Sequence, residues 1–187
     1  MSREIIQIVG NPGSGKTELA KHLCENYDLY YIRPSAIIKA YADARDLHLV
    51  SRNDFLDAHL KMEDEFGSDY VSTQILQSTD KPLCVDGIRP LKQFQTLKEA
   101  GALSIALWCP LGVRYARAVS RGDEKDSQTL AQFAQAEAAE YNSGIPPYPA
   151  TIAVMHLADY AIDSSQPFQV VASTATELVE AHTNLRP

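Results

Sequence analysis

Three features are scarce in this sequence of 187 residues: long apolar runs, paired cysteines and positive charge. No run of about 18 apolar residues is present, so no segment has the length and composition of a membrane-spanning helix. The formal net charge of -7 at pH 7 disfavours non-specific binding to nucleic acid, because such binding requires a basic surface. We therefore expect neither a membrane nor a nucleic acid as the partner of this chain.

The cysteines and the overall composition limit the classes of protein to which this chain can belong. Cys24, Cys84 and Cys109 are odd in number and far apart, and none has CxxC spacing, so we interpret them as small core residues. The first residues lead into a short apolar strand and do not resemble a signal peptide. These observations predict a cytoplasmic protein. Hydrophobic residues make up 45% of the chain, which is typical of one globular domain, predicted over residues 1–187.

Five short apolar runs have the length of buried strands, and segments with helical patterns separate them. They cover residues 5–9, 29–32, 83–85, 103–109 and 160–162. Strands that alternate with helices form parallel sheets, because each connection must cross one face of the sheet. The pattern predicts a three-layer α/β/α fold with a five-stranded parallel sheet.

Signals for the start of a helix precede several of the intervening segments. Ser35, Ser51 and Ser68 are predicted N-caps, and Pro90 stands where the first turn of another helix would begin. The first predicted helix begins at about residue 15. Further predicted helices cover 36–44, 52–66, 69–77 and 111–120, and another runs from a Ser127 cap through about Tyr141. The polar residues 122–126 and the proline-rich residues 142–149 predict loops.

The segment after the first predicted strand matches the phosphate-binding pattern GxxxxGKS/T. Its residues are Gly10, Asn11, Pro12, Gly13, Ser14, Gly15, Lys16 and Thr17. The glycines allow backbone amides to surround a phosphate, and the following helix adds the positive end of its dipole. Lys16 would reach the β and γ phosphates, and Thr17 would bind Mg²⁺, so the segment predicts a site for ATP and Mg²⁺. The alternative, a glycine-rich turn with an exposed lysine, requires an accidental match of both spacing and setting.

An acidic residue follows the third predicted strand. Asp86 stands at the carboxyl end of that strand, where open parallel sheets bind their ligands. We predict that Asp86 holds Mg²⁺, directly or through water, and orients the attacking group. Because Asp-Gly pairs are also common in turns, capping of the turn at Gly87 is the alternative interpretation. Arg89 lies three residues beyond Asp86, so a single turn would place it at the same ligand site.

Three further arginines share one face of a predicted helix. Arg114, Arg117 and Arg121 have the spacing i, i+3, i+7. Phosphoryl transfer depends mainly on positioning and on neutralising charge, and planar guanidinium groups match phosphate oxygens. We predict that these arginines contact the phosphates of the nucleotide. The alternative is an ordinary solvated helix face.

Together these motifs resemble the nucleoside monophosphate kinase superfamily of adenylate kinases and dephospho-CoA kinases. The resemblance spans nearly the whole chain and rests on the GxxxxGKT loop, Asp86-Gly87-Ile88-Arg89, residues 114–122 and residues 158–162. The small adenylate-kinase-related branch is the most similar, and its F-x-x-R-D-x-x-E-x-x-x-x-G-I segment corresponds to residues 133–145. Ala136 stands where that branch has arginine, and residues 31–35 lack the aspartate of acceptor-site loops.

The resemblance implies a role for each motif. Asp86 matches the metal-side acid, Arg89 matches a contact to the acceptor, and the three later arginines match a lid, about residues 112–145, that closes over ATP. Closure expels water that would otherwise accept the γ-phosphate. An acceptor-binding insertion is implied at about residues 33–67, and residues 159–165 are implied to lie near the adenine. The predicted catalytic residues are Lys16, Asp86, Arg89, Arg117 and Arg121, and Arg114 and Arg117 are predicted to join the loop in binding ATP.

The implied insertion contains several candidates for binding an acceptor. Arg33, Arg45 and Arg52 could bind its phosphate, and Tyr41 or Phe55 could stack on its base. Each also has an ordinary interpretation as a surface charge or a core aromatic.

Other polar residues of the insertion carry no predicted role. The three consecutive acids at 63–65 are interpreted as a solvated helix face. His48 and His59 have no metal-ligand partner at a useful spacing, so no catalytic role is predicted for them.

We therefore predict an ATP-dependent phosphotransferase that moves the γ-phosphate of ATP to a small nucleotide or nucleotide-like acceptor, as a monomer or a homodimer. One alternative is an ATP-binding or ATP-hydrolysing switch that controls a partner protein. A GTPase is disfavoured, because the NKxD motif is absent and the third strand lacks a DxxG motif. A polynucleotide 5′-end kinase would share the loop, acid and arginine, but the acidic balance disfavours it.

Overall fold

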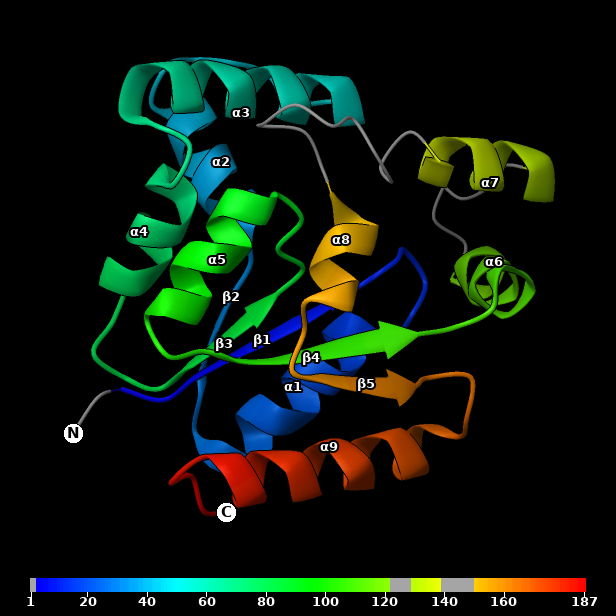
Figure 1. Cartoon of the computed structure of the whole chain (residues 1–187). Helices are drawn as coiled ribbons and strands as arrows, with labels where there is room; N and C mark the ends of the chain where they lie inside the picture. The colour runs from blue at the N-terminus through cyan, green and yellow to red at the C-terminus, as the bar shows by residue number, and fades with distance from the viewer. Residues whose placement is uncertain (1–2, 122–128, 139–149) are drawn as a thin grey trace.

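The computed structural model describes residues 3–121, 129–138 and 150–187, without the side chains of Arg52 and Asn53. Its centre is a five-stranded sheet in the order β2-β3-β1-β4-β5, and all neighbouring strands run parallel (Figure 1). The strands are β1 (Ile5–Gly10), β2 (Tyr30–Ile32), β3 (Leu83–Asp86), β4 (Leu103–Trp108) and β5 (Tyr160–Asp163). The predicted five-stranded parallel sheet is confirmed, with shifts of one residue at some strand ends.

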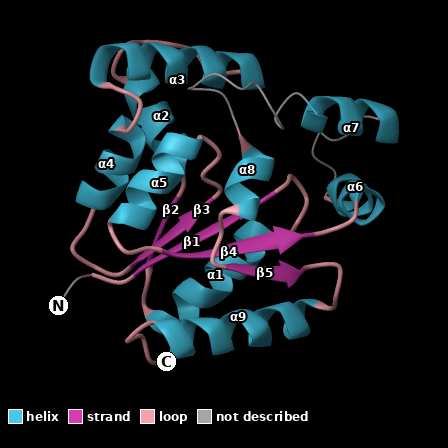
Figure 2. Cartoon of the chain, viewed as in Figure 1, coloured by secondary structure: helices cyan, strands magenta, loops and turns pink. Residues whose placement is uncertain are grey.

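Helices cover both faces of this sheet (Figure 2). One face carries α1 (Lys16–Tyr27) and α9 (Phe168–His182), and the other carries α2 (Pro34–Asp43), α3 (Arg52–Phe66), α4 (Tyr70–Gln77), α5 (Leu91–Glu99) and α8 (Thr151–His156). Two more helices, α6 (Leu111–Ser120) and α7 (Leu130–Ala138), lie beyond the carboxyl end of β4 (Figure 1). The three-layer α/β/α arrangement therefore matches the prediction.

The core is divided by the sheet into two apolar layers, because alternate side chains of a strand point to opposite faces. On β1, Ile5 and Val9 pack toward α5 and α8, whereas Ile6 and Ile8 pack toward α1 and α9. All four side chains are buried, and each contributes about 1.5–3 kcal/mol through removal from water. Burial on both faces explains why this strand reads as a continuous apolar run.

The helix start signals were correct at one serine and wrong at two. Ser51 caps α3 in a capping box, since its hydroxyl accepts from the amide of Asp54 (3.2 Å) while its own amide donates to the Asp54 carboxylate (2.6 Å). Ser35 is not a cap, because α2 begins one residue earlier at Pro34, whose restricted φ suits a first helical position. Ser68 is not a cap either, because Asp69 precedes the first residue of α4.

Some expectations fall on residues that the structure does not describe. The Ser127 cap, the helix end near Tyr141 and the loops at 122–126 and 142–149 lie outside the described residues, and α7 is described only over Leu130–Ala138. Two helices, α8 and α9, were not predicted. The three cysteines are free thiols, with Cys84 buried and the other two half-buried. Among the described helices, none has both the length and the apolarity that crossing a membrane requires.

Candidate phosphate and metal site

The loop between β1 and α1 has the backbone that its glycines make possible. Gly13 and Gly15 have φ angles of 76° and 90°, a left-handed region that side chains with a Cβ rarely adopt. Gly13 also has no room for a side chain, because a Cβ there would lie 2.6 Å from the carbonyl oxygen of Arg114. The loop is thus held against α6 at a contact that only glycine permits.

The side chains of the loop carry the groups that a phosphate site needs. Lys16 donates from Nζ to the carbonyl oxygen of Asn11 at 2.8 Å, and its Cε lies beside Gly87, where a Cβ would be 3.8 Å away. The hydroxyl of Ser14 is buried and has no hydrogen-bond partner among the described residues. A phosphate oxygen or a water molecule inside the loop would satisfy that hydroxyl. Lys16 therefore lies beside the turn that follows β3.

Asp86 faces this loop across the parallel pair β1 and β3, in which it lies opposite Ile8. Asp86 is 2% exposed, and its carboxylate accepts a hydrogen bond from the Thr17 hydroxyl at 2.7 Å. The turn-capping interpretation of Asp86 is wrong, because the amide of Gly87 donates to the carbonyl oxygen of Ile8 instead (3.0 Å). The structure thus brings Thr17 and Asp86, the two predicted metal ligands, into direct contact.

Tyr31 of β2 and Arg33, which follows that strand, also reach Asp86, and neither contact was predicted. The phenol of Tyr31 donates to Asp86 Oδ2 at 2.8 Å, and Nε of Arg33 lies 3.7 Å from the same oxygen. Burial and the bond to this carboxylate raise the pKa of Tyr31 above its ordinary value, so the phenol stays protonated and remains a donor. Residues two apart in an extended segment share a face. Arg33 continues the extended backbone of β2, and this spacing is the signal that could have grouped it with Tyr31.

Thr17 and Asp86 fit a magnesium ion bound with a nucleotide. Among the described residues, no group of three or more His, Cys, Asp or Glu side chains could hold a metal ion alone. Mg²⁺ at nucleotide sites is typically held by one or two protein oxygens, with phosphates and water completing the shell. A hydroxyl and a carboxylate beside a phosphate-binding loop are the oxygen ligands that such a site uses.

The three predicted lid arginines occupy different environments. Arg114 is buried and donates two hydrogen bonds, from Nε to the carbonyl oxygen of Cys109 (2.8 Å) and from Nη1 to the carbonyl oxygen of Pro12 (3.2 Å). It also forms an ion pair with Glu137 of α7 (2.6 Å). Its guanidinium thus connects α6 with the loop and with α7. The arrangement differs from a single solvated stripe, and the predicted contact of Arg114 with ATP stays a prediction.

Arg117, Arg121 and Arg89 lie around the same end of the sheet. Arg117 donates from Nη2 to the carbonyl oxygen of Ser164 (2.8 Å), and its Nη1 is 4.0 Å from where a Cβ on Gly15 would stand. Arg121 is exposed at the end of α6, and Arg89 is half-buried in the loop after β3. Arg117 is therefore next to the glycine loop, while the catalytic roles of all three remain predictions.

The acceptor candidates of the insertion lie in different environments, and two of them, Arg45 and Tyr41, contact each other. The guanidinium of Arg45 lies 3.9 Å from the ring centre of Tyr41 and pairs with Glu65 at 2.6 Å, an arrangement typical of a helix surface. Phe55 packs against the apolar core. The side chain of Arg52 lies outside the described residues. Arg33 is the candidate that lies beside Asp86.

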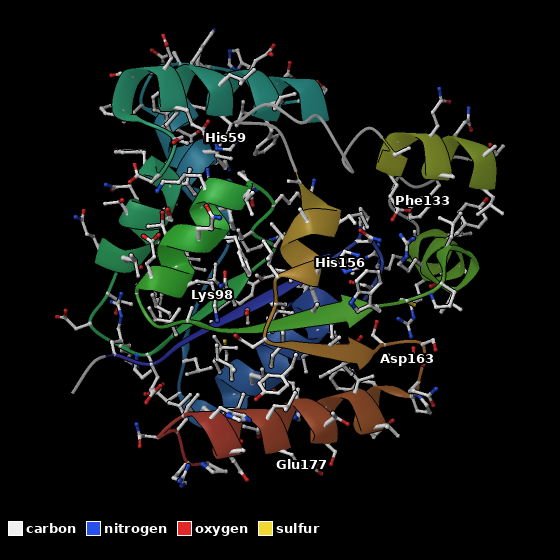
Figure 3. All side chains as sticks on the ribbon, in the orientation of Figure 1. His59, Lys98, Phe133, His156, Asp163 and Glu177 are labelled. Atoms are coloured by element: carbon white, nitrogen blue, oxygen red, sulfur yellow. The ribbon has the colours of Figure 1, made fainter. Side chains whose placement is uncertain are left out.

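The interpretation of residues 63–65 as a solvated face is wrong at Glu63, which is buried. The Glu63 carboxylate lies 3.0 Å from Nε2 of His59 and accepts a hydrogen bond from Nε2 of Gln93 at 3.0 Å. The same Gln93 nitrogen lies 2.8 Å from Nε2 of His59. Figure 3 shows His59 on the side of α3 that faces α5. This polar cluster joins the two helices, and only the three-dimensional fold brings its residues together.

The strand order, the glycine loop at the start of α1 and the acid at the end of β3 define a P-loop kinase fold. A family model described as an AAA domain matches residues 6–142, and the chain belongs to that family of P-loop proteins. The predicted resemblance to P-loop kinases is thereby confirmed.

Individual proteins support the same assignment. The chain is similar to a UPF0200 protein of Sulfurisphaera tokodaii, with 29% identity over 182 residues that cover 95% of this chain and 96% of that protein. Among solved structures, it resembles TT1252 from Thermus thermophilus (TM-score 0.65, 15% identity, 96% of this chain and 98% of that chain). It also resembles shikimate kinase from Acinetobacter baumannii in complex with shikimate (TM-score 0.58, 15% identity, 96% and 93%). These structural likenesses establish the fold.

Proposed function

We propose that this protein transfers the γ-phosphate of ATP to a small nucleotide or nucleotide-like acceptor. The observation that carries the proposal is the 2.7 Å contact between Thr17 of the phosphate loop and the buried carboxylate of Asp86. Bound Mg²⁺ would neutralise charge on the phosphates during transfer. A hydroxyl and a carboxylate placed together beside the loop are what that ion requires.

The residues of the chain divide the remaining work. The loop backbone binds the β and γ phosphates, Lys16 moves from the carbonyl oxygen of Asn11 to the phosphate oxygens, and Arg117 adds positive charge beside Gly15. Asp86 orients the attacking group of the acceptor. The free thiols of the three cysteines fit the reducing cytoplasm, where ATP is supplied.

The acceptor in this proposal carries a negative group. Arg33 precedes the first residue of α2, is about half exposed and lies 3.7 Å from Asp86, so a phosphate on the acceptor could pair with it close to the site of transfer. Shikimate kinase, whose fold this chain shares, is named for a small acid, which supports a small-molecule acceptor here. Arg89 is the second cation proposed to meet the acceptor.

A coupled assay of ADP formation tests the proposal, with ATP, Mg²⁺ and a panel of mononucleotides, nucleosides, dephospho-CoA and small organic acids. One acceptor should raise ADP formation well above the basal rate, and Lys16→Ala should abolish that increase. Lys21→Ala is the matched control, because Lys21 is an exposed lysine on the same helix. ATP turnover that no acceptor changes would contradict the proposal and favour the nucleotide switch.

A further inference from the structure

The short edge strand β2 sends one side chain directly to the acid of the phosphate site. The phenol of Tyr31 donates to Oδ2 of Asp86 at 2.8 Å, and the hydroxyl of Thr17 donates to the same oxygen at 2.7 Å. These two donors come from different elements, β2 and α1, and they meet on one buried carboxylate of β3. The proposed transfer gives Tyr31 no role of its own.

We propose that Tyr31 is a positioning residue that holds the carboxylate of Asp86 in the orientation that binds the Mg²⁺ ion of the nucleotide complex. This inference rests on the proposed function. Tyr31 acts through Asp86 and touches neither ATP nor the acceptor. Residues that orient a metal-binding group through a hydrogen bond tune the affinity of the site for its ion. Their loss typically lowers that affinity by roughly 10- to 100-fold.

The competition between Tyr31 and Arg33 explains why the phenol is needed. A buried carboxylate is stabilised by donors, and Asp86 has two hydroxyls at hydrogen-bond distance. The guanidinium of Arg33 is at 3.7 Å, beyond hydrogen-bond distance, and is half exposed, so it is free to move closer. Without the phenol, the carboxylate would turn toward that cation and away from Thr17. The phenol thus keeps Asp86 paired with Thr17 and leaves Arg33 available for an anionic acceptor.

Tyr31→Phe removes only the hydroxyl and keeps the ring in place. Tyr30→Phe is the matched control, because Tyr30 is the preceding residue of the same strand and its side chain is exposed. The binding of Mn²⁺ in the presence of saturating ADP is measured by electron paramagnetic resonance, and the binding of ADP without metal by calorimetry. We expect Tyr31→Phe to weaken Mn²⁺ binding roughly 10-fold, with metal-free ADP binding unchanged. Tyr30→Phe should match the wild type in both measurements.

A double variant separates action through Asp86 from a general loss of structure. In an Asp86→Asn background, adding Tyr31→Phe should cause no further loss of Mn²⁺ affinity, because the group that Tyr31 positions is already changed. Equal Mn²⁺ affinity in wild type and Tyr31→Phe would overturn the inference. So would a parallel loss of metal-free ADP binding or full additivity in the double variant. If the wild type itself binds no ADP, the proposed function fails. If the wild type binds Mn²⁺ and ADP but the binding does not depend on Tyr31, only the role of Tyr31 fails.

Discussion

Thr17 and Asp86 lie within 2.7 Å of each other although 69 positions separate them in the chain. Two structural elements cause this contact. The parallel pairing of β1 with β3 places Asp86 opposite Ile8. The glycine loop then reverses the direction of the chain, so that the first turn of α1 lies beside the carboxyl end of β3. The contact is therefore a consequence of strand order and of a tight turn, and the proposed magnesium ion would bind at it.

The first prediction concerns the charge at this contact. Asp86→Asn keeps the shape of the side chain but removes its negative charge, so we expect acceptor-dependent turnover with Mg²⁺ to fall roughly 10²-fold or more. Nucleotide binding without metal should be retained, because the loop backbone is unchanged. Steady-state kinetics and metal-free calorimetry measure the two effects. Asp64→Asn, at an exposed acid on α3, is the control, and wild-type turnover in Asp86→Asn would refute the metal role.

The second prediction concerns the contact of the loop with α6. Gly13→Ala should displace the loop, because the new Cβ would lie 2.6 Å from the carbonyl oxygen of Arg114 and φ at this position is 76°. We expect nucleotide affinity to fall by at least roughly 10-fold and stability to fall by about 1–3 kcal/mol. Equilibrium binding and urea unfolding provide the measurements.

Gly112→Ala is the matched control for this change. Gly112 lies on α6 itself, and a Cβ there would meet nothing within 4 Å. Because alanine has a higher helix propensity than glycine, this variant should be stabilised by about 0.4–1 kcal/mol, with nucleotide affinity unchanged. Equal affinity in the two variants would show that the loop does not depend on its close approach to α6.

Local patterns were enough to predict the sheet and the phosphate loop. The central strands β1, β3 and β4 are continuous apolar runs because both of their faces are buried. The loop pattern combines a fixed spacing with a fixed setting between a strand and a helix. Asp86 could be placed because the carboxyl ends of parallel strands meet at one edge. Each of these inferences depends on residues close together in sequence or on one general rule of topology.

Side chains whose partners are distant in sequence could not be placed in this way. Arg114 has the spacing of a surface stripe, but its partner Glu137 is on another helix, so its burial has no local signal. Glu63 reads as one of three surface acids until α5 brings Gln93 to it. Tyr31 reads as an edge-strand aromatic until β3 places Asp86 beside it. In each case, long-range packing decides whether a polar residue faces water or a partner.

The third prediction concerns the buried ion pair of Arg114 and Glu137. Arg114→Met would leave the Glu137 carboxylate buried without its cation, at a cost of about 3–5 kcal/mol in the free energy of unfolding. Adding Glu137→Leu should recover most of that loss, since a well-packed apolar pair is often as stable as a buried ion pair. Urea unfolding of the single and double variants measures both steps. Equal stability of the two would contradict a direct interaction between these residues.

The fourth prediction concerns the dependence of stability on pH through Asp159, which precedes β5. Its carboxylate accepts hydrogen bonds from the amide (2.8 Å) and the hydroxyl (2.6 Å) of Ser104 on β4, and Lys98 of α5 donates to it at 2.6 Å. Partial burial works to raise its pKa, but the bonds from Lys98 and Ser104 outweigh that effect and hold the pKa of Asp159 below its ordinary value. The charged form is therefore favoured more in the folded than in the unfolded chain.

A depressed pKa in the folded state contributes stability at pH values above the pKa of the unfolded state, about 3.9 for aspartate. That contribution is lost as the pH falls through the folded-state value. Asp159→Asn removes it, so the difference in unfolding free energy between wild type and variant should be largest near pH 7 and should shrink below about pH 4. Urea unfolding of both proteins between pH 7 and pH 3 measures this difference, and Asp64→Asn serves as the surface control. A difference that stays constant over this range would show that Asp159 stabilises the fold through packing and neutral hydrogen bonds, independently of its charge.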